Sequence, residues 1–292
     1  MDDQAANLRA AAARKLPLPT PGGRLHQCRV LAVTGGKGGV GKTNVAVNLS
    51  LALQEAGARV LLLDADLGLA NVDLLLGLSP QHTLQHVIRR QVELEQIVID
   101  GPLGLHVLPG SIGLPEMASL PTLDVVRLLG ALRALEREHD LLVIDTAAGI
   151  GSTVLRFVMA ADDVVIVTTP EPPAILDAFG LIKALNASHC PAQLSLLVNM
   201  LRQRSELLET HRSLATVAAR YFGSPLRLLG GLPLDESIVA CIKQQKPFYI
   251  ERPHSPVSRA LREIAQELLD GRLAPPAAPQ QGYFSRLLSS VR

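Results

Sequence analysis

The chain has 292 residues, of which 48% are hydrophobic, 19% charged and 3% aromatic, and its formal net charge is +1. This length and apolar content suit one large α/β domain with tails, and a net charge near zero gives no global electrostatic basis for binding nucleic acid. The three cysteines and eight histidines form no metal-ligand spacing, and the first residues include no apolar signal segment. We therefore expect a cytoplasmic protein that has no transition-metal site and does not bind nucleic acid directly.

The predicted elements begin with a short Ala-rich helix at residues 1–15, which a Pro/Gly cluster separates from the rest, so residues 1–24 are expected to form a mobile arm. Apolar runs then alternate with amphipathic stretches such as NVAVNLSLALQEAG, TLDVVRLLGALRALEREHD and SELLETHRSLATVAARYFG. The runs, typical of parallel strands buried on both faces, are RVLAVTG, RVLLLDAD, LHVLPG, LLVIDTAAG, DVVIVTTP, LSLLVNM and LRLLGGLP. This alternation predicts an α/β fold with a doubly wound, mainly parallel sheet over residues 25–271, closed by a helix at about 255–270.

The first strand runs into GKGGVGKT, residues 36–43, which satisfies the phosphate-loop pattern G-x-x-x-x-G-K-[ST] between a predicted strand and a predicted helix. Glycines allow the backbone N–H groups to approach phosphate oxygens, Lys42 is expected to reach the β- and γ-phosphates, and the Thr43 hydroxyl is expected to bind Mg²⁺. The sequence therefore predicts ATP/ADP and Mg²⁺ as cofactors, with nucleotide contacts from Gly36, Lys37, Gly38, Gly39, Val40, Gly41, Lys42, Thr43 and Asn44.

A second lysine, Lys37, lies in the same loop, where it is either a solvated charge on the rim or a cation that reaches phosphate in a neighbouring subunit. The segment KGGVGKT resembles the deviant Walker A signature of the MinD/ParA/nitrogenase-iron-protein class of P-loop ATPases, and the resemblance covers about residues 28–270. It implies that Lys37 crosses a nucleotide-sandwich dimer to act with Lys42 in catalysis. ATP would then stabilise a homodimer, and slow hydrolysis would release it.

Carboxylates follow two of the predicted strands, where ligands bind in parallel sheets. The resemblance implies that Asp66 positions the attacking water and that Asp64 supports the Mg²⁺ shell, although Asp64 would also suit a simple cap of a strand–loop turn. LLVID has the Walker B pattern, so Asp145 is expected to hold Mg²⁺, and the following Gly149 suits a switch that senses the γ-phosphate.

Two later strand ends are candidates for binding the base. An amide can pair with both donor and acceptor edges of adenine, so the resemblance implies that Asn199 reads adenine while Pro233 and Asp235 flank the ring. The alternative is that all three are ordinary turn residues. One departure from related loops is Gly35, where relatives usually have serine, and we expect it to have no consequence.

The end of the chain, residues 272–292, contains a Pro-rich linker and then YFSRLLSSVR. Its spacing at i, i+3, i+4 and i+7 predicts an amphipathic, membrane-targeting helix whose apolar face is Phe284, Leu287, Leu288 and Val291. The same face would also suit a terminal helix that docks on its own domain. Burying four such side chains contributes about 6–12 kcal/mol and ordering the helix costs a similar amount, so one tail would bind a membrane marginally and a dimer better.

The cysteines do not match the cluster ligands of iron proteins, and no basic patch resembles those of DNA-partitioning ATPases. The arm DQAANLR resembles the D-Q-A-x-x-L-R motif of the FlhG (FleN) family of flagellar number regulators. That resemblance implies that the arm stimulates an FlhF-type signal-recognition GTPase and that other partners are a FleQ-type activator or flagellar switch-complex proteins. The matching residues are Asp3, Gln4, Ala5, Leu8 and Arg9.

Together these features predict an ATPase that cycles between the cytoplasm and the inner face of the cell membrane and regulates flagellar number and placement. Two alternatives remain open: a MinD-type division-site ATPase, and a nucleotide-gated scaffold in which hydrolysis is only a timer. Loss of turnover in an Asp66 variant that still binds its partners would favour the scaffold.

Overall fold

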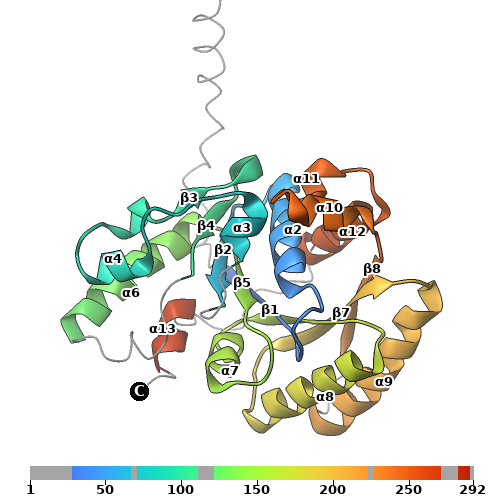
Figure 1. The fold of residues 1–292 in the computed structure, drawn as a ribbon. Helices are drawn as coiled ribbons and strands as arrows, with labels where there is room; N and C mark the ends of the chain where they lie inside the picture. The colour runs from blue at the N-terminus through green and yellow to red at the C-terminus, as the bar shows by residue number, and fades with distance from the viewer. Residues whose placement is uncertain (1–27, 67–70, 111–121, 223–225, 271–281, 290–292) are drawn as a thin grey trace, which may run out of the picture.

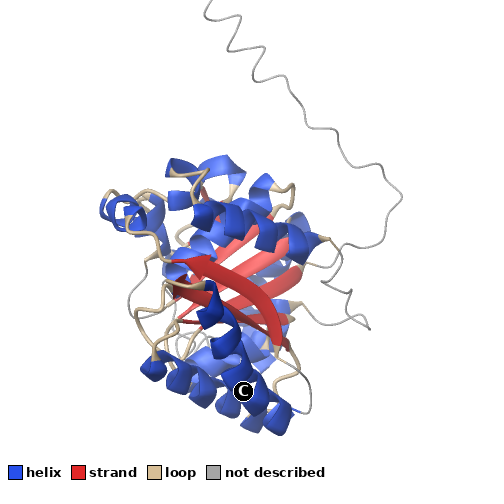
Figure 2. Cartoon of the chain, turned by 90° about the vertical axis from the view of Figure 1, so that its right-hand side faces the viewer, coloured by secondary structure: helices blue, strands red, loops and turns tan. Residues whose placement is uncertain are grey.

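The computed structural model describes residues 28–66, 71–110, 122–222, 226–270 and 282–289, which form an eight-stranded sheet with helices on both faces (Figure 1, Figure 2). The strand order is β3-β4-β2-β5-β1-β6-β7-β8, and all pairs are parallel except β3 with β4. The strands are β1 (Arg29–Thr34), β2 (Val60–Ala65), β3 (Ile99–Asp100), β4 (His106–Leu108), β5 (Leu141–Thr146), β6 (Asp163–Thr168), β7 (Gln193–Leu201) and β8 (Arg227–Pro233).

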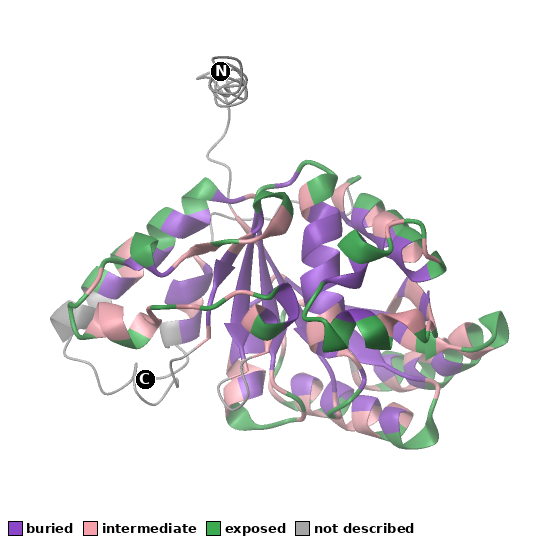
Figure 3. Ribbon diagram, turned by 45° about the horizontal axis from the view of Figure 1, so that its top comes forward, coloured by how far each residue is buried: buried purple, intermediate pink, exposed green. Residues whose placement is uncertain are grey.

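The seven predicted strands are all present, because their consecutive apolar residues are buried on both faces of the sheet (Figure 3). In β5, for example, Leu142 and Ile144 belong to one core cluster, whereas Leu141 and Val143 belong to the cluster on the other face. The eighth strand, β3, is not among the predicted strands, because it has only two residues.

Helices cover the two faces in separate layers. Residues of α2, α11 and α12 contribute to one core cluster, and residues of α6, α7, α8, α9 and α13 contribute to the other. The helices are α2 (Lys42–Glu55), α3 (Val72–Leu76), α4 (Leu84–Ile88), α6 (Thr122–Glu138), α7 (Ser152–Met159), α8 (Pro172–Ala187), α9 (Arg204–Phe222), α10 (Ser237–Lys243), α11 (Phe248–Glu251), α12 (Pro256–Leu269) and α13 (Tyr283–Ser289), with 3₁₀ turns η1 (Leu94–Gln96) and η2 (Pro102–Gly104). The helix predicted at 255–270 is α12, which starts where Ser255 Oγ accepts the Ser258 N–H and Pro256 follows the cap.

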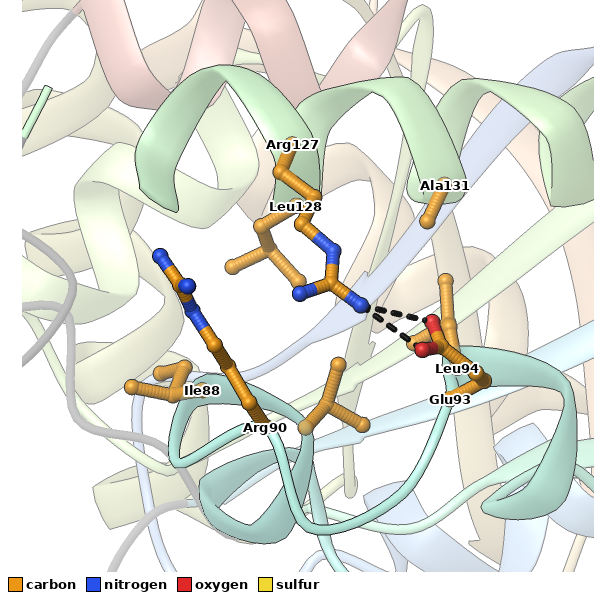
Figure 4. Close-up of a pocket in the computed structure, with 8 residues that line it drawn as sticks. Ile88, Arg90, Glu93, Leu94, Arg127, Leu128 and Ala131 are labelled. Atoms are coloured by element: carbon orange, nitrogen blue, oxygen red, sulfur yellow. Dashed lines mark hydrogen bonds and ion pairs between the residues drawn. The ribbon is translucent and has the colours of Figure 1, made fainter. Parts of the chain in front are cut away.

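The segment after α3 builds the far edge of the sheet. It contains α4 and η1, which pack against α6, and the chain then adds β3 outside β4. Figure 4 shows the joint between η1 and α6, where one guanidinium nitrogen of Arg127 donates to both carboxylate oxygens of Glu93 at 2.7 and 3.0 Å. Leu94 lies beneath this ion pair and is fully buried, so the segment is anchored by both apolar and charged contacts.

The C-terminal helix α13 lies against the domain rather than standing free (Figure 1). Tyr283, Phe284 and Leu287 are at most 4% exposed and join the core cluster beside α6 and α7. Phe284 and Leu287 of the predicted apolar face are therefore covered in this conformation, because they pack on the apolar surface, here called the groove, where α6 and α7 meet α13. The side chain of Leu288, and Val291, lie outside the described residues.

Polar contacts in the first half of α13 add to the docking. The Phe284 N–H donates to Glu136 Oε1 at 3.1 Å, and Arg286 donates to the Ala160 carbonyl and to Asp162 Oδ1, each at 2.9 Å. Burial raises the pKa of the Glu136 carboxyl, an effect that the Phe284 N–H opposes.

The N-terminal arm, with Asp3, Gln4, Ala5, Leu8 and Arg9, lies outside the described residues, so the structure does not test it. Within the described ranges, no helix has the length and hydropathy needed to cross a membrane.

Candidate functional site

The predicted nucleotide residues gather at the carboxyl edge of the sheet, where β1, β2, β5, β7 and β8 all end. The glycine-rich loop connects β1 to α2, which begins at Lys42. Gly41 precedes the helix with a φ of 87°, a left-handed conformation that favours glycine. The first N–H groups of α2 lack intrahelical partners, so the helix start can bind an anion.

Gly36 lies directly against α8. A Cβ atom at this position would lie 2.2 Å from the Asp177 carbonyl oxygen and 2.8 Å from the Ala178 nitrogen, both main-chain atoms of that helix. At Gly35 a Cβ would lie 2.7 Å from the Val167 carbonyl oxygen. The serine that relatives usually have there would not fit this loop without a shift, so Gly35 permits a closer approach to β6.

Lys42 is buried although it carries a charge. Its ammonium donates to the Lys37 carbonyl oxygen at 3.4 Å, and burial lowers its pKa, which the Asp145 and Asp66 carboxylates oppose. A buried ammonium that makes one long hydrogen bond to a carbonyl of the described residues is well placed to bind a phosphate oxygen. The Lys37 side chain is half-buried on the loop rim and forms no ion pair within the described part of the chain.

Asp145 fits a magnesium site. Its side chain is 1% exposed, and neither carboxylate oxygen accepts a hydrogen bond from a described residue. Burial raises the pKa of this carboxyl to about 7, although the nearby Thr43 side chain and Lys42 ammonium oppose the rise. A hard cation would satisfy both orphaned oxygens, and Thr43 and Asp145 offer it the oxygen ligands that Mg²⁺ prefers. The residues present therefore fit the predicted cofactor.

The raised pKa of Asp145 predicts that the stability of the nucleotide-free protein depends on pH. Between about pH 4 and 7 the folded protein keeps a proton on Asp145 that the unfolded chain has lost, so the free energy of unfolding falls as pH rises through this window. We expect Asp145→Asn to be more stable than the wild type at pH 8, by at most about 4 kcal/mol. Urea unfolding without Mg²⁺ or nucleotide at pH 5 and pH 8 tests this; an equal difference at both values would contradict it.

Asp64 pairs with Asp145 in the β2–β5 register but has a different environment. Its Oδ1 accepts the Asp66 N–H at 3.0 Å, and its Oδ2 accepts the N–H groups of Asn71 at 3.0 Å and Val72 at 3.1 Å. Burial nevertheless raises the pKa of the Asp64 carboxyl. These contacts are those of a cap of a strand–loop turn, the alternative that the sequence leaves open for Asp64.

The predicted switch residue, Gly149, is linked to the phosphate loop. Its N–H donates to the Gly35 carbonyl oxygen at 3.0 Å, and its φ is 97°. The Gly149 N–H would have to break its hydrogen bond to Gly35 in order to turn toward a phosphate. This coupling suits the predicted switch, because a change at Gly149 would also affect the phosphate loop.

The predicted base-binding residues line one open pocket beside the phosphate loop. Gly41, Asn44, Asn199, Pro233 and Asp235 lie on its wall. The Asn199 side chain donates to the Val40 carbonyl oxygen at 2.9 Å and accepts the Met200 N–H, so this amide also supports the phosphate loop.

Asp235 has a local task as well, since its Oδ1 accepts from both the N–H and the hydroxyl of Ser237 at the start of α10. The sequence reasoning missed the apolar wall opposite, made by Ile238, Val239 and Ile242 of α10. Their i, i+1, i+4 spacing in SIVACIK, directly after the predicted Asp235, was the available signal.

Comparison with known proteins agrees with this geometry. A family model described as an AAA domain matches residues 28–192, and one described as NUBPL iron-transfer P-loop NTPase matches residues 131–269. The MinC:MinD cell division protein complex of Aquifex aeolicus matches with a TM-score of 0.65 and 26% identity, covering 88% of this chain and 100% of that one. MinD of Pyrococcus horikoshii, complexed with Mg-ADP, has a TM-score of 0.67 at 24% identity over 83% of this chain and 96% of its own, which shows the shared fold.

Two curated relatives are flagellar proteins by name. Flagellum site-determining protein YlxH of Helicobacter pylori is 35% identical, covering 89% of this chain and 90% of its own length. Antiactivator FleN of Pseudomonas aeruginosa is 44% identical over 246 residues, which cover 84% of this chain and 88% of FleN. Taken with the phosphate loop and the sheet around it, this similarity shows that the chain belongs to the FleN/FlhG family of MinD/ParA-type P-loop ATPases.

Proposed function

We propose that this protein is an ATPase that dimerises on ATP, cycles on and off the membrane, and regulates the number and placement of flagella. The observation that carries the proposal is the pair of lysines. Lys42 is buried in a loop complete for one nucleotide, while Lys37 lies on the rim without an ion pair among the described residues. A second copy of the chain, with its own nucleotide, would give the Lys37 ammonium a phosphate to bind.

In this proposal the chain's groups have separate tasks in hydrolysis. Lys42 and the start of α2 hold the phosphates. Lys37 of the second copy places its positive charge beside the negative charge that develops on the phosphate oxygens, and Asp66 orients the water. Mg²⁺, held by Thr43 and Asp145, would supply the charge neutralisation that phosphoryl transfer needs. Turnover is expected to be slow, because the ATP-bound dimer is the acting form and hydrolysis ends it.

Exposed apolar side chains on the same face support self-association. Ile150 follows β5, Leu176 lies in the first turns of α8, and Leu234 follows β8, with exposed fractions of 54%, 69% and 41%. All three follow the carboxyl ends of strands that surround the nucleotide site, so a second copy placed there would cover them.

Membrane cycling requires that α13 leave its groove. Burial of Tyr283, Phe284 and Leu287 contributes about 5–9 kcal/mol, and ordering a seven-residue helix costs about 7–14 kcal/mol, so docking is close to balanced. A weakly docked helix can leave the domain and bind a lipid surface instead. Two tails on one dimer would bind the membrane more tightly than one, because the first raises the effective concentration of the second at the surface.

The flagellar assignment rests on relatives rather than on the site. FleN and YlxH have flagellar names and are 44% and 35% identical to this chain, whereas MinD of Synechocystis is 32% identical, which favours a flagellar role over division-site placement. The expected partners are an FlhF-type GTPase that binds the N-terminal arm, and a FleQ-type activator or switch-complex proteins.

Light-scattering mass with ADP and with ATP tests the core of the proposal. We expect ATP to double the mass of the wild type transiently and of Asp66→Ala persistently, because the latter cannot position water. Lys37→Ala should bind ATP and stay monomeric, whereas Lys183→Ala, which removes an exposed lysine of α8, should behave as wild type.

A wild-type mass that stays monomeric with bound ATP would overturn the dimer and the membrane cycle that depends on it. If the dimer forms, pelleting with anionic vesicles in ADP and ATP tests membrane binding directly. An Asp66→Ala protein that still binds its flagellar partner and still regulates would indicate the nucleotide-gated scaffold.

A further inference from the structure

Two carboxylates lie side by side at the end of neighbouring strands and differ in what they contact. Asp64 of β2 and Asp145 of β5 are paired in register, and their exposed fractions are 2% and 1%. Asp64 accepts three main-chain N–H groups, whereas Asp145 accepts no main-chain N–H from a described residue and has only the Thr43 side chain nearby as a donor. The two groups are thus unequal candidates for holding a cation.

The oxygens of Asp64 are largely occupied. A carboxylate oxygen can accept about two hydrogen bonds, and Oδ2 already accepts the N–H groups of Asn71 and Val72. A cation at Oδ2 would have to displace those amides, and each buried amide left without an acceptor costs about 1–3 kcal/mol. The Asn71 side chain forms no cap hydrogen bond to α3, so the start of this helix depends on Asp64 for the acceptor of these two N–H groups.

The three amides come from two separate points of the chain. Asp66 follows Asp64 by two residues, whereas Asn71 and Val72 begin α3 after the intervening residues. One carboxylate therefore joins the residue proposed to orient water to the start of α3. On the other side, a Cβ at Gly110 would lie 2.3 Å from the Asp64 carbonyl oxygen, so the main chain of Asp64 is itself closely confined.

We propose that Asp64 is a positioning residue that holds the main chain at Asp66 against the start of α3, and that Asp145 rather than Asp64 serves the magnesium side of the site. This deepens the proposed ATPase function and rests on it, because Asp66 matters only if water attacks ATP there. Asp64 acts through Asp66 and touches neither nucleotide nor metal.

The test compares Asp64→Asn with Asp145→Asn. Asparagine has the same shape but presents an N–H₂ group to at least one of the amides, so the first variant should break the link without changing volume. In the nucleotide-free protein, we expect exchange of the Asp66, Asn71 and Val72 amides to accelerate by about tenfold or more in Asp64→Asn. The same amides should be unchanged in Asp145→Asn.

Magnesium dependence of ATP hydrolysis provides the second readout. Asp64→Asn should lower kcat by about tenfold or more, with the half-saturating Mg²⁺ concentration unchanged within about twofold. Asp145→Asn should raise that concentration by about tenfold or more, because it removes a charged oxygen ligand. If Asp64→Asn instead raises the Mg²⁺ requirement, or leaves the three amides unchanged, the proposal is wrong.

A wild-type measurement avoids any folding defect of the variants. Mg²⁺ added to the ADP-bound protein should leave exchange of the Asp66, Asn71 and Val72 amides unchanged or slower, whereas a metal on Oδ2 would accelerate exchange at Asn71 and Val72 and a metal that displaces the Asp66 N–H from Oδ1 would accelerate exchange at Asp66. A wild-type protein that does not hydrolyse ATP would refute the proposed function, while the exchange experiments would still decide whether Asp64 holds these amides.

Discussion

A Gly36→Ala variant is expected to lose about 100-fold in affinity for ATP, whereas Gly38→Ala is expected to keep its affinity within about threefold. The new methyl group at Gly36 would lie 2.2 Å from the Asp177 carbonyl oxygen. This oxygen belongs to the main chain of α8, so the clash cannot be relieved by rotating a side chain. The same methyl group at Gly38 would have nothing within 4 Å. Overpacking costs typically about 1–3 kcal/mol, and here the loop that must shift is the one that cradles phosphate.

Titration calorimetry with ADP and a non-hydrolysable ATP analogue measures the difference, with thermal unfolding as the check that both variants fold. The two glycines lie two residues apart in the same loop, so Gly38→Ala makes the same chemical change as Gly36→Ala and is a matched control. Equal losses at Gly36 and Gly38 would mean that the loop needs glycine for its own conformation and that contact with α8 is unimportant.

The second large effect is expected on the surface of the nucleotide face. Leu176→Asp should weaken ATP-dependent dimerisation by about 100-fold, because burying a leucine contributes about 2–3 kcal/mol and a buried unpaired carboxylate costs more. ATP binding to the monomer should be unaffected, since Leu176 points to solvent with 69% of its surface exposed.

The matched control is Leu103→Asp, which changes another exposed leucine in η2, at the amino edge of β4 and the far end of α2. Leu103 has a φ of 59°, a conformation that aspartate tolerates at least as well as leucine. Light scattering over a dilution series gives both dimerisation constants. A dimer that survives Leu176→Asp but not Leu103→Asp would place the interface on the opposite edge of the sheet.

The sequence predicts best those features that a local pattern determines. Strands β1, β2, β5 and β6 are apolar on consecutive residues because both faces are covered, and the phosphate loop has a spacing that few other structures require. Strand β3 could not be predicted from its own sequence. It has only two residues, and these are extended because they pair with β4, a contact that forms only in the folded chain.

The site shows the same limit at the level of single side chains. Asp64 and Asp145 each end an apolar strand, in LLLD and LLVID, so their local sequences give no reason to separate their roles. Only the chain that returns at Asn71 and Val72 separates them, because it brings amides to Asp64 and none to Asp145. The apolar face of the tail is similarly ambiguous, since a helix groove and a lipid surface both select the i, i+3, i+4 pattern.

The docked tail affects how truncated forms of this protein should be interpreted. Removing residues 272–292 would delete a proposed membrane anchor and at the same time uncover the groove on α6 and α7 that Tyr283, Phe284 and Leu287 fill. A freshly uncovered apolar groove favours self-association and aggregation. A shortened chain would therefore be a different molecule in solubility and assembly as well as in localisation, and single substitutions on the tail are the cleaner way to separate those properties.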